Sequence, residues 1–198
     1  MTDKRDAAAR EAEDLWVFAY GSLVWNPGFE PAERRPACLR GFRRAFAMRS
    51  IHHRGTEEAP GLVLALDYEE GAACDGLALR VRTEEARKVM EALRERELIS
   101  SAYLERRVRL DTDRGEIVAV AFVVDREHPQ YAGGLPEDVQ AEIIARARGG
   151  RGPNDEYLHK TARALHDAGI GDAALDRLSE KVRRFGDNPA NALAPPQS

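Results

Sequence analysis

Apolar residues along this chain fall into short runs separated by polar and glycine-rich breaks. The first run opens the stretch Leu15 to Phe29 and breaks at Gly21 and Ser22, which predicts a buried strand followed by a loop. Five more strand-like runs cover Leu39 to Ser50, Gly61 to Asp67, Asp75 to Arg82, Tyr103 to Asp111 and Glu116 to Val124. Glutamate and glycine residues separate the second and third of these five runs, a pattern that predicts a hairpin. We expect Glu30 to Pro36 to be a polar connector.

Other segments have the apolar period of a helix. They run from Thr83 to about Leu98, Pro136 to Arg148, Asn154 to Ala168 and Ala173 to Phe185. Only the first of them lies among the strand-like runs. Together the elements predict an α+β fold, a mixed and mostly antiparallel strand barrel flanked by helices, in a single domain.

Length and composition set the limits of that domain. A chain of 198 residues suits one domain with a proper core. Residues 1–14 alternate charge and alanine without an apolar face, and we expect a frayed helix or a disordered arm there. The domain is predicted over residues 15–185. Residues 186–198 are rich in proline, asparagine and alanine, and are predicted to form a flexible tail.

Charge and cysteine content narrow the class of protein. Lysine and arginine number 30 against 34 aspartate and glutamate residues, a net charge of −4, which argues against nucleic acid or an acidic membrane surface as a partner. No apolar run approaches the roughly 20 residues that span a bilayer, and the first residues show no hydrophobic signal region. We therefore expect no membrane association and a cytoplasmic location. Cys38 and Cys74 are expected to be reduced thiols.

One glutamate is predicted to face the apolar side of a helix. In the helix after Thr83, Glu97 lies four residues past Leu93 and so falls on the apolar stripe, whereas Glu95 falls on the solvated side. A carboxylate in an apolar setting has a raised pKa, which suits general acid and base catalysis. Two alternatives stay open: the helix ends before Glu97, or Arg96 or another arginine neutralises the carboxylate.

The loop after the first strand is a candidate for anion binding. A strand that ends in Tyr20, Gly21 and Ser22 leaves backbone N–H groups without ladder partners, which could hold an anion or an oxyanion. An ordinary tight turn is the alternative. Ser22 lies in YGSL, which lacks the second glycine of a nucleophile elbow, and no histidine is placed to activate it, so it is predicted to be a donor. None of the histidines matches a zinc signature, and no metal site is expected.

The ordered motifs resemble those of the ChaC-type, glutathione-specific γ-glutamylcyclotransferases. The resemblance extends from Trp16 to about Phe185. It rests on VFAYGSLVWNPGF, GFRRAF, HRGT, PGLVLAL, DGLALRV, LRERELISSAYL, HPQYAGGLP and GPNDEYL. The departures are Ala19, where glycine is common, and the charged arm before Leu15. The family implies a γ-glutamylcyclotransferase-like barrel that needs no metal or other cofactor.

The resemblance also implies the residues of an active site. It assigns binding of the γ-glutamyl moiety to Val17, Phe18, Ala19, Tyr20, Gly21, Ser22 and Leu23. It makes Glu97, which follows Arg96, the catalytic acid and base, and it places Tyr103 and Tyr157 at the same pocket. We further expect Arg54 to bind the carboxylate at the glycine end of the substrate; the alternative is a solvated loop arginine.

The implied reaction is the cleavage of glutathione into 5-oxoproline and Cys-Gly. The substrate's α-amine attacks its own γ-carbonyl carbon, with Glu97 moving the protons. A cyclotransferase for other γ-glutamyl amino acids or amines is one alternative. A non-catalytic binding module of the same fold is another.

Overall fold

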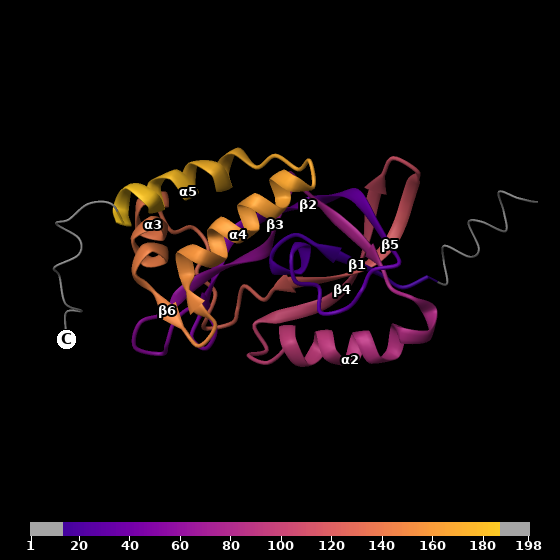
Figure 1. Cartoon of the computed structure of the whole chain (residues 1–198), viewed down its shortest axis with the longest axis horizontal. Coiled ribbons are helices and arrows are strands. Elements are labelled where there is room, and N and C mark those ends of the chain that lie inside the picture. The colour runs from indigo at the N-terminus through magenta and orange to yellow at the C-terminus, as the bar shows by residue number, and fades with distance from the viewer. Residues whose placement is uncertain (1–13, 187–198) are drawn as a thin grey trace, which may run out of the picture. The chain divides into compact units, whose positions relative to one another are not determined.

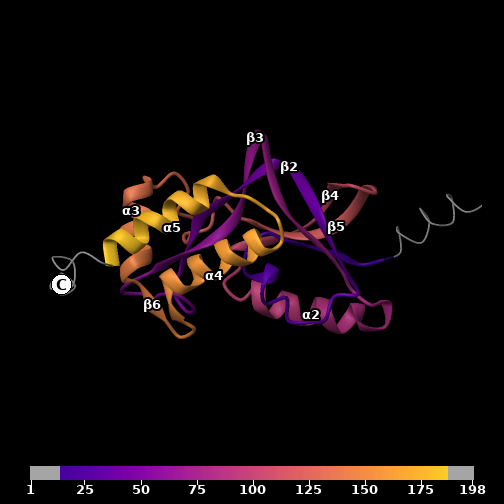
Figure 2. The same cartoon turned by 45° about the horizontal axis from the view of Figure 1, so that its top comes forward.

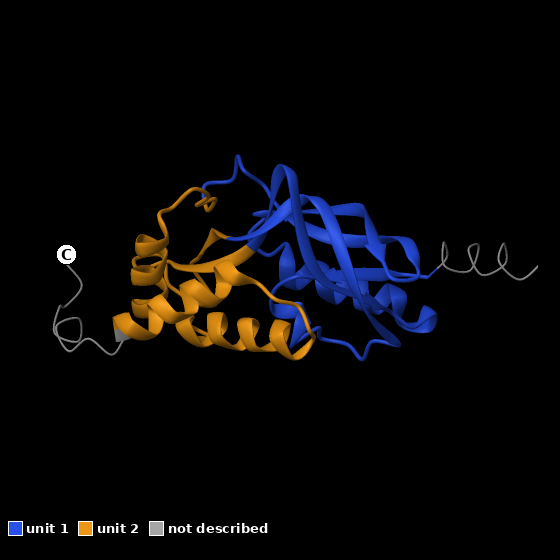
Figure 3. Cartoon of the chain, turned by 90° about the horizontal axis from the view of Figure 1, so that it is seen from above, with its two compact units in different colours: residues 1–45, 65–129 blue, residues 46–64, 130–198 orange. Residues whose placement is uncertain are grey.

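The structure, a computed structural model, describes residues 14–186. Residues 1–13 of the predicted arm and residues 187–198 of the predicted tail lie outside the described residues. Gly186, predicted as the first residue of the tail, is instead the last residue of a helix. The described chain divides into two compact units (Figure 3). Unit 1 holds residues 14–45 and 65–129, and unit 2 holds residues 46–64 and 130–186.

Unit 1 is built around a closed barrel. The strands are β1 (Trp16–Ala19), β2 (Glu33–Ser50), β3 (Gly61–Arg80), β4 (Tyr103–Thr112) and β5 (Gly115–Val124), labelled in Figure 1. Their order is β1-β3-β2-β4-β5. The β1–β3, β2–β4 and β4–β5 pairs are antiparallel. A parallel pairing of Val17 with Val120 joins β1 to β5. The predicted mixed, mostly antiparallel barrel is confirmed.

The predicted hairpin between residues 61–67 and 75–82 is wrong. Both runs belong to β3, which continues without a reversal from Gly61 to Arg80. Residues 68–71 are exposed, so their polar composition resembles a turn although the backbone stays in the strand. Gly71 takes a φ of +79°, a conformation that glycine adopts at a bulge without a steric penalty.

The strand β2 begins earlier than the sequence predicts. Glu33 to Pro36 was expected in the polar connector, yet these residues already belong to β2. The inward residue there is Arg35, which is buried. Its guanidinium carbon lies 4.7 Å from the centre of the Trp16 ring, and its Nη2 lies 2.9 Å from Glu33 Oε1. A charged residue on the inward face hides the alternation that marks a strand.

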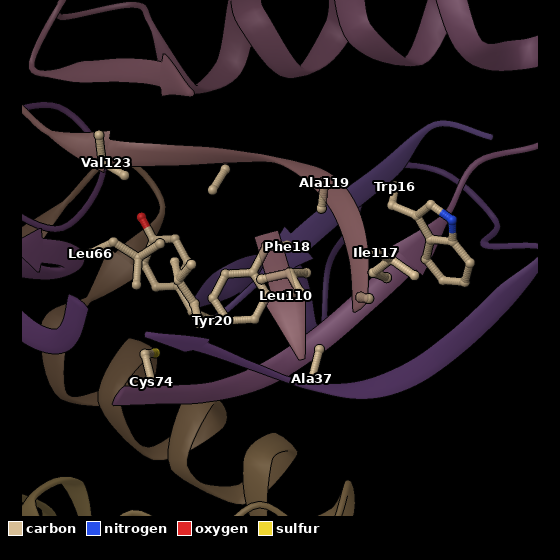
Figure 4. Close-up of a cluster of buried hydrophobic side chains, with 13 residues drawn as sticks. Trp16, Phe18, Tyr20, Ala37, Leu66, Cys74, Leu110, Ile117, Ala119 and Val123 are labelled. Carbon is tan, nitrogen blue, oxygen red and sulfur yellow. The ribbon is translucent and has the colours of Figure 1, made fainter. Parts of the chain in front are cut away.

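The centre of the barrel is an aromatic and aliphatic core. Phe18 lies in β1, and Tyr20 directly follows that strand. Their rings lie beside each other, with centres 6.2 Å apart, and Leu66 packs in the same cluster (Figure 4). The Tyr20 hydroxyl donates a hydrogen bond of 2.8 Å to the carbonyl of Phe122. This bond satisfies a polar group that would otherwise be buried without a partner.

The helix α2 (Ala86–Glu97) lies beside the barrel in unit 1 (Figures 1 and 2). It follows a short 3₁₀ helix, η2 (Thr83–Glu85). Val89, Met90 and Leu93 form its buried face, as the apolar period predicts. On the other side, Arg94 donates two hydrogen bonds, of 2.7 and 2.9 Å, to the carboxylate of Glu105 on β4. These contacts form a partly exposed ion pair between α2 and β4.

Unit 2 contains the three later helices. They are α3 (Glu137–Arg146), α4 (Asn154–Asp167) and α5 (Ala173–Gly186), and α5 packs against both of the others. All three were predicted, with boundaries within two residues. A small ladder of β6 (Arg148–Gly149) and β7 (Gly152–Pro153) was not predicted. The side chain of Asn154 accepts from the N–H of Leu62 at 2.6 Å and donates to its carbonyl at 2.7 Å, which ties α4 to the start of β3.

Candidate active site

The loop after β1 presents backbone N–H groups at its turn. A short 3₁₀ helix, η1 (Ser22–Val24), follows Gly21. Its first hydrogen bond runs from the N–H of Val24 to the carbonyl of Gly21 at 3.0 Å. The N–H groups of Ser22 and Leu23 precede that bond, so the helix itself supplies no acceptor for them. The chain then folds back, and the N–H of Asn26 donates to the Ser22 carbonyl at 2.8 Å.

Most side chains of the predicted γ-glutamyl-binding segment face the interior. Those of Val17, Phe18 and Ala19 are fully buried, and Tyr20 and Leu23 are nearly so. Ser22 is half-buried. Any substrate contact from this segment therefore falls to the backbone around Gly21 and to the Ser22 side chain. The assignment of these residues to substrate binding stays a prediction.

Glu97 occupies the last position of α2 and turns inward. Its side chain is 18% exposed, whereas Glu95 is exposed, as the position on the apolar stripe predicts. The alternative with a neutralising arginine holds as well, because Arg96 Nε lies 3.0 Å from Glu97 Oε1. The carboxylate is thus largely removed from solvent and lies beside one positive charge.

Arg96 connects this carboxylate to the loop after β1. Its Nη2 donates a hydrogen bond of 2.7 Å to Ser22 Oγ, and its Nη1 donates one of 2.6 Å to the carbonyl of Asn26. From the sequence, Arg96 is predicted only as a charge that neutralises Glu97. Adjacency to Glu97 was the only signal available, since nothing in the local pattern indicates that a helix residue reaches a loop 74 positions away.

A second arginine binds the start of the same loop. Arg44 on β2 donates a hydrogen bond of 2.6 Å from Nε to the carbonyl of Tyr20, and its Nη2 donates to the carbonyl of Asp75 on β3. The loop is therefore bound by one guanidinium at Tyr20 and by another at Ser22 and Asn26. Tyr103, the first residue of β4, is also buried in this unit.

Arg54 and Tyr157 lie in unit 2. Arg54 is buried, so the alternative of a solvated loop arginine is wrong. Its Nη1 donates to the carbonyl of Pro153 at 2.9 Å, and its guanidinium carbon lies 5.7 Å from the centre of the Tyr157 ring. Burial is the main cause that lowers the pKa of Arg54, and the nearby Glu156 opposes it. The Tyr157 hydroxyl accepts from the N–H of Leu64 at 3.3 Å.

Two general features of the described residues bear on the class of protein. Across residues 14–186, no three or more histidine, cysteine, aspartate or glutamate side chains gather in a way that could hold a metal ion. No helix in this part of the chain has both the length and the apolar character needed to cross a membrane.

Known proteins resemble this chain over most of its length. A glutathione-specific γ-glutamylcyclotransferase of Escherichia coli K12 is 37% identical over 172 residues, which are 86% of this chain and 74% of the relative. Gamma-glutamylcyclotransferase 2-1 of Arabidopsis thaliana is 36% identical over 188 residues, or 91% of this chain and 87% of the relative.

A solved structure shares the fold. The yeast γ-glutamyl cyclotransferase specific to glutathione superimposes with a TM-score of 0.81 at 24% identity, covering 88% of this chain and 97% of the yeast chain. This confirms the predicted γ-glutamylcyclotransferase-like fold. The sequence model of the ChaC-like protein family matches residues 15–185 in a single span that includes residues of both units. The chain therefore belongs to the ChaC-like protein family.

Proposed function

We propose that this chain is a glutathione-specific γ-glutamylcyclotransferase, a lyase that cleaves glutathione into 5-oxoproline and Cys-Gly. The proposal is supported by relatives that carry this name, including the one from Escherichia coli. The observation that carries it is the arrangement at Arg96, whose guanidinium contacts both the inward Glu97 and the Ser22 hydroxyl. An acid–base group and a set of hydrogen-bond donors thus belong to one local structure.

The reaction is an intramolecular ring closure. The α-amine nitrogen of the substrate bonds to its γ-carbonyl carbon, and the bond from that carbon to the cysteine nitrogen breaks. No water is consumed, because the amine is the nucleophile. The enzyme must hold the two ends of one residue together, a positioning effect worth up to roughly 7–11 kcal/mol in well-oriented cases.

Glu97 moves the protons in this proposal. The substrate amine arrives protonated, so the ionised carboxylate first accepts its proton. The same group then donates that proton to the leaving nitrogen of Cys-Gly, and the carboxylate is regenerated. The ring nitrogen gives up its second excess proton as the intermediate collapses, and the released amine of Cys-Gly takes up a proton to become an ammonium. Its low exposure keeps competing water away from the exchange.

The loop after β1 would stabilise the negative charges of the substrate. The N–H groups around Gly21 and Ser22 are proposed to bind the α-carboxylate and the oxyanion that develops on the γ-carbonyl oxygen. Ser22 Oγ already accepts a hydrogen bond from Arg96, which draws electron density away from the oxygen. It is therefore suited to donate its proton and poorly suited to act as a nucleophile.

The remaining assignments follow the resemblance. Tyr103, Tyr157 and Arg54 are proposed as further substrate contacts. We also propose a cytoplasmic location, where glutathione is kept reduced. The two free thiols, Cys38 and Cys74, are compatible with such a compartment.

The test is 5-oxoproline release from glutathione by the purified protein, compared with a Glu97→Gln variant and a Glu95→Gln control. Glutamine keeps the shape of the side chain but cannot accept the proton, so we expect a loss of kcat of at least about 100-fold. Glu95 carries the same carboxylate on the exposed face of α2, and its variant should keep full activity. A Glu97→Gln variant that retains most of the activity would contradict the role of Glu97.

A second candidate is a cyclotransferase for other γ-glutamyl amino acids or amines. The name of the Arabidopsis relative does not specify glutathione, and this supports a broader substrate range as the second candidate. Parallel assays with γ-Glu-Ala and γ-Glu-Lys separate the two candidates, since activity confined to glutathione supports the first. Binding of glutathione without turnover would instead indicate a non-catalytic module.

A further inference from the structure

One guanidinium in unit 1 contacts three groups that come from two distant segments. Arg96 donates to Ser22 Oγ at 2.7 Å and to the Asn26 carbonyl at 2.6 Å, and its Nε lies 3.0 Å from Glu97 Oε1. Its side chain is only 17% exposed. Two of the guanidinium nitrogens therefore donate hydrogen bonds, and the third lies in ion-pair contact with Glu97. The planar group cannot rotate without losing at least one of these contacts.

The contacts follow the loop along its return path. A Cβ atom added at Gly28 would lie 3.9 Å from Arg96 Nη1, so the backbone stays close to the guanidinium from Ser22 to Gly28. The φ of Gly28 is +81°, which lets the chain turn there at little cost. Movement of Arg96 would thus affect the whole loop and not one hydrogen bond alone.

The contact with Ser22 also sets the direction of its proton. Since Oγ accepts from Arg96, the hydroxyl hydrogen must point elsewhere. A hydroxyl that accepts from a cation becomes a stronger donor toward a further acceptor, because polarisation passes along a chain of hydrogen bonds.

We propose that Arg96 is a positioning residue that holds the Ser22 hydroxyl and the Glu97 carboxylate in fixed relation for the reaction. The inference rests on the proposed function. In this role Arg96 does not touch the substrate; it acts through Ser22 on one side and Glu97 on the other. A purely structural ion pair would stabilise α2 without affecting the chemical step.

Kinetics of Arg96 variants test this role. Arg96→Gln should lower kcat about 100-fold, because displacement of reacting groups by about 1 Å can cost that much. Arg96→Lys should recover only part of the loss, since one ammonium cannot contact three separate oxygen atoms as the planar guanidinium does. The matched control is Arg94→Gln, which removes an ion pair from the same helix and should leave kcat and KM unchanged. A fall in activity that only follows the folded fraction would overturn the proposal.

A double-mutant cycle tests whether Arg96 acts through Ser22. We expect Ser22→Ala to lower kcat about 10-fold, and the double variant Ser22→Ala with Arg96→Gln to be about as impaired as Arg96→Gln alone. Effects that multiply, to about 1,000-fold, would mean that the two residues act independently and would overturn the coupling.

Hydrogen exchange gives a readout that does not depend on activity. Arg96→Gln should speed amide exchange at residues 21–26 at least about 10-fold, whereas the amides of β4 keep their wild-type rates. Arg94→Gln should change neither. If exchange at residues 21–26 stays unchanged, Arg96 does not hold the loop and the proposal fails.

A wild type that makes no 5-oxoproline would contradict the proposed function, while the exchange experiment still decides whether Arg96 holds the loop. Should Arg96→Gln not fold, Arg96→Lys is measured in its place.

Discussion

Arg54 is held inside unit 2 by contacts that leave little of its side chain exposed. Its backbone N–H donates to Ser50 Oγ at 3.0 Å, and its guanidinium donates to the carbonyl of Pro153 at 2.9 Å. The Tyr157 ring covers the guanidinium at 5.7 Å. Buried charges with such partners commonly support a fold, and the same residue is also the proposed contact for the substrate's far carboxylate.

A role of Arg54 in stability and a role in substrate binding predict different effects of its removal. Arg54→Ala leaves the Pro153 carbonyl without its donor and the Tyr157 face uncovered, so we expect the free energy of unfolding in urea to fall by about 2 kcal/mol. The exposed neighbour Arg151 is the control, and Arg151→Ala should change it by less than about 0.5 kcal/mol. A variant of Arg54 with wild-type stability and a raised KM for glutathione would contradict the structural role and leave substrate binding as the function of Arg54.

The packing of α5 on α4 includes a histidine with a restricted environment. His159 Nδ1 lies 2.7 Å from the Oγ of Ser179, which is itself buried. Burial is the main cause that lowers the pKa of His159; Arg183 on α5 lowers it further, and Asp155 on α4 opposes them. The neutral imidazole is therefore the form that fits between these helices.

This histidine makes the stability of the helical contact depend on pH. In the unfolded chain the imidazole protonates near its ordinary pKa of about 6.5, whereas in the folded chain it protonates only at lower pH. The unfolded state thus binds more protons between these two values, and the free energy of unfolding falls as the pH drops below about 6.5. Urea unfolding at pH 8, 6.5 and 5 measures this loss. A His159→Gln variant, which has no group that titrates there, should lose less stability over the same interval; equal losses would contradict the assignment.

Helices and strands with a regular apolar period were predicted correctly. Strands whose pattern is interrupted by charged residues, buried or exposed, were not. The stripe of α2 gave the inward position of Glu97, and the structure confirms that orientation. The start of β2 was missed because Arg35 faces Trp16, and β3 was divided because residues 68–71 are exposed. The contact of Arg96 with Ser22 could not be predicted, since the two residues lie far apart in sequence. Local periodicity carries no information about such contacts.

At the scale of the whole barrel, one buried carboxylate joins three segments. Asp67 on β3 is fully buried. Arg43 on β2 reaches it at 3.2 Å, and Arg126, just after β5, reaches it at 2.6 Å. Arg126 also donates to the carbonyl of Tyr68. Since β3 and β5 meet at Leu66 and Val123, this cluster lies where these two strands of the barrel pair.

Removing that carboxylate should destabilise the barrel as a unit. Asp67→Ala leaves a cavity and two arginines that must turn to solvent, and we expect a loss of about 3 kcal/mol, the lower end for a broken buried pair because both arginines are half-exposed. Glu69→Ala is the control: Glu69 pairs with the same Arg43 at 2.8 Å, but its side chain is 52% exposed, so its loss should stay below about 1 kcal/mol. Chemical denaturation followed by tryptophan fluorescence reports on the barrel directly, since Trp16 lies in its core. Equal losses for the two variants would mean that Asp67 contributes no more to the stability of the barrel than a surface ion pair.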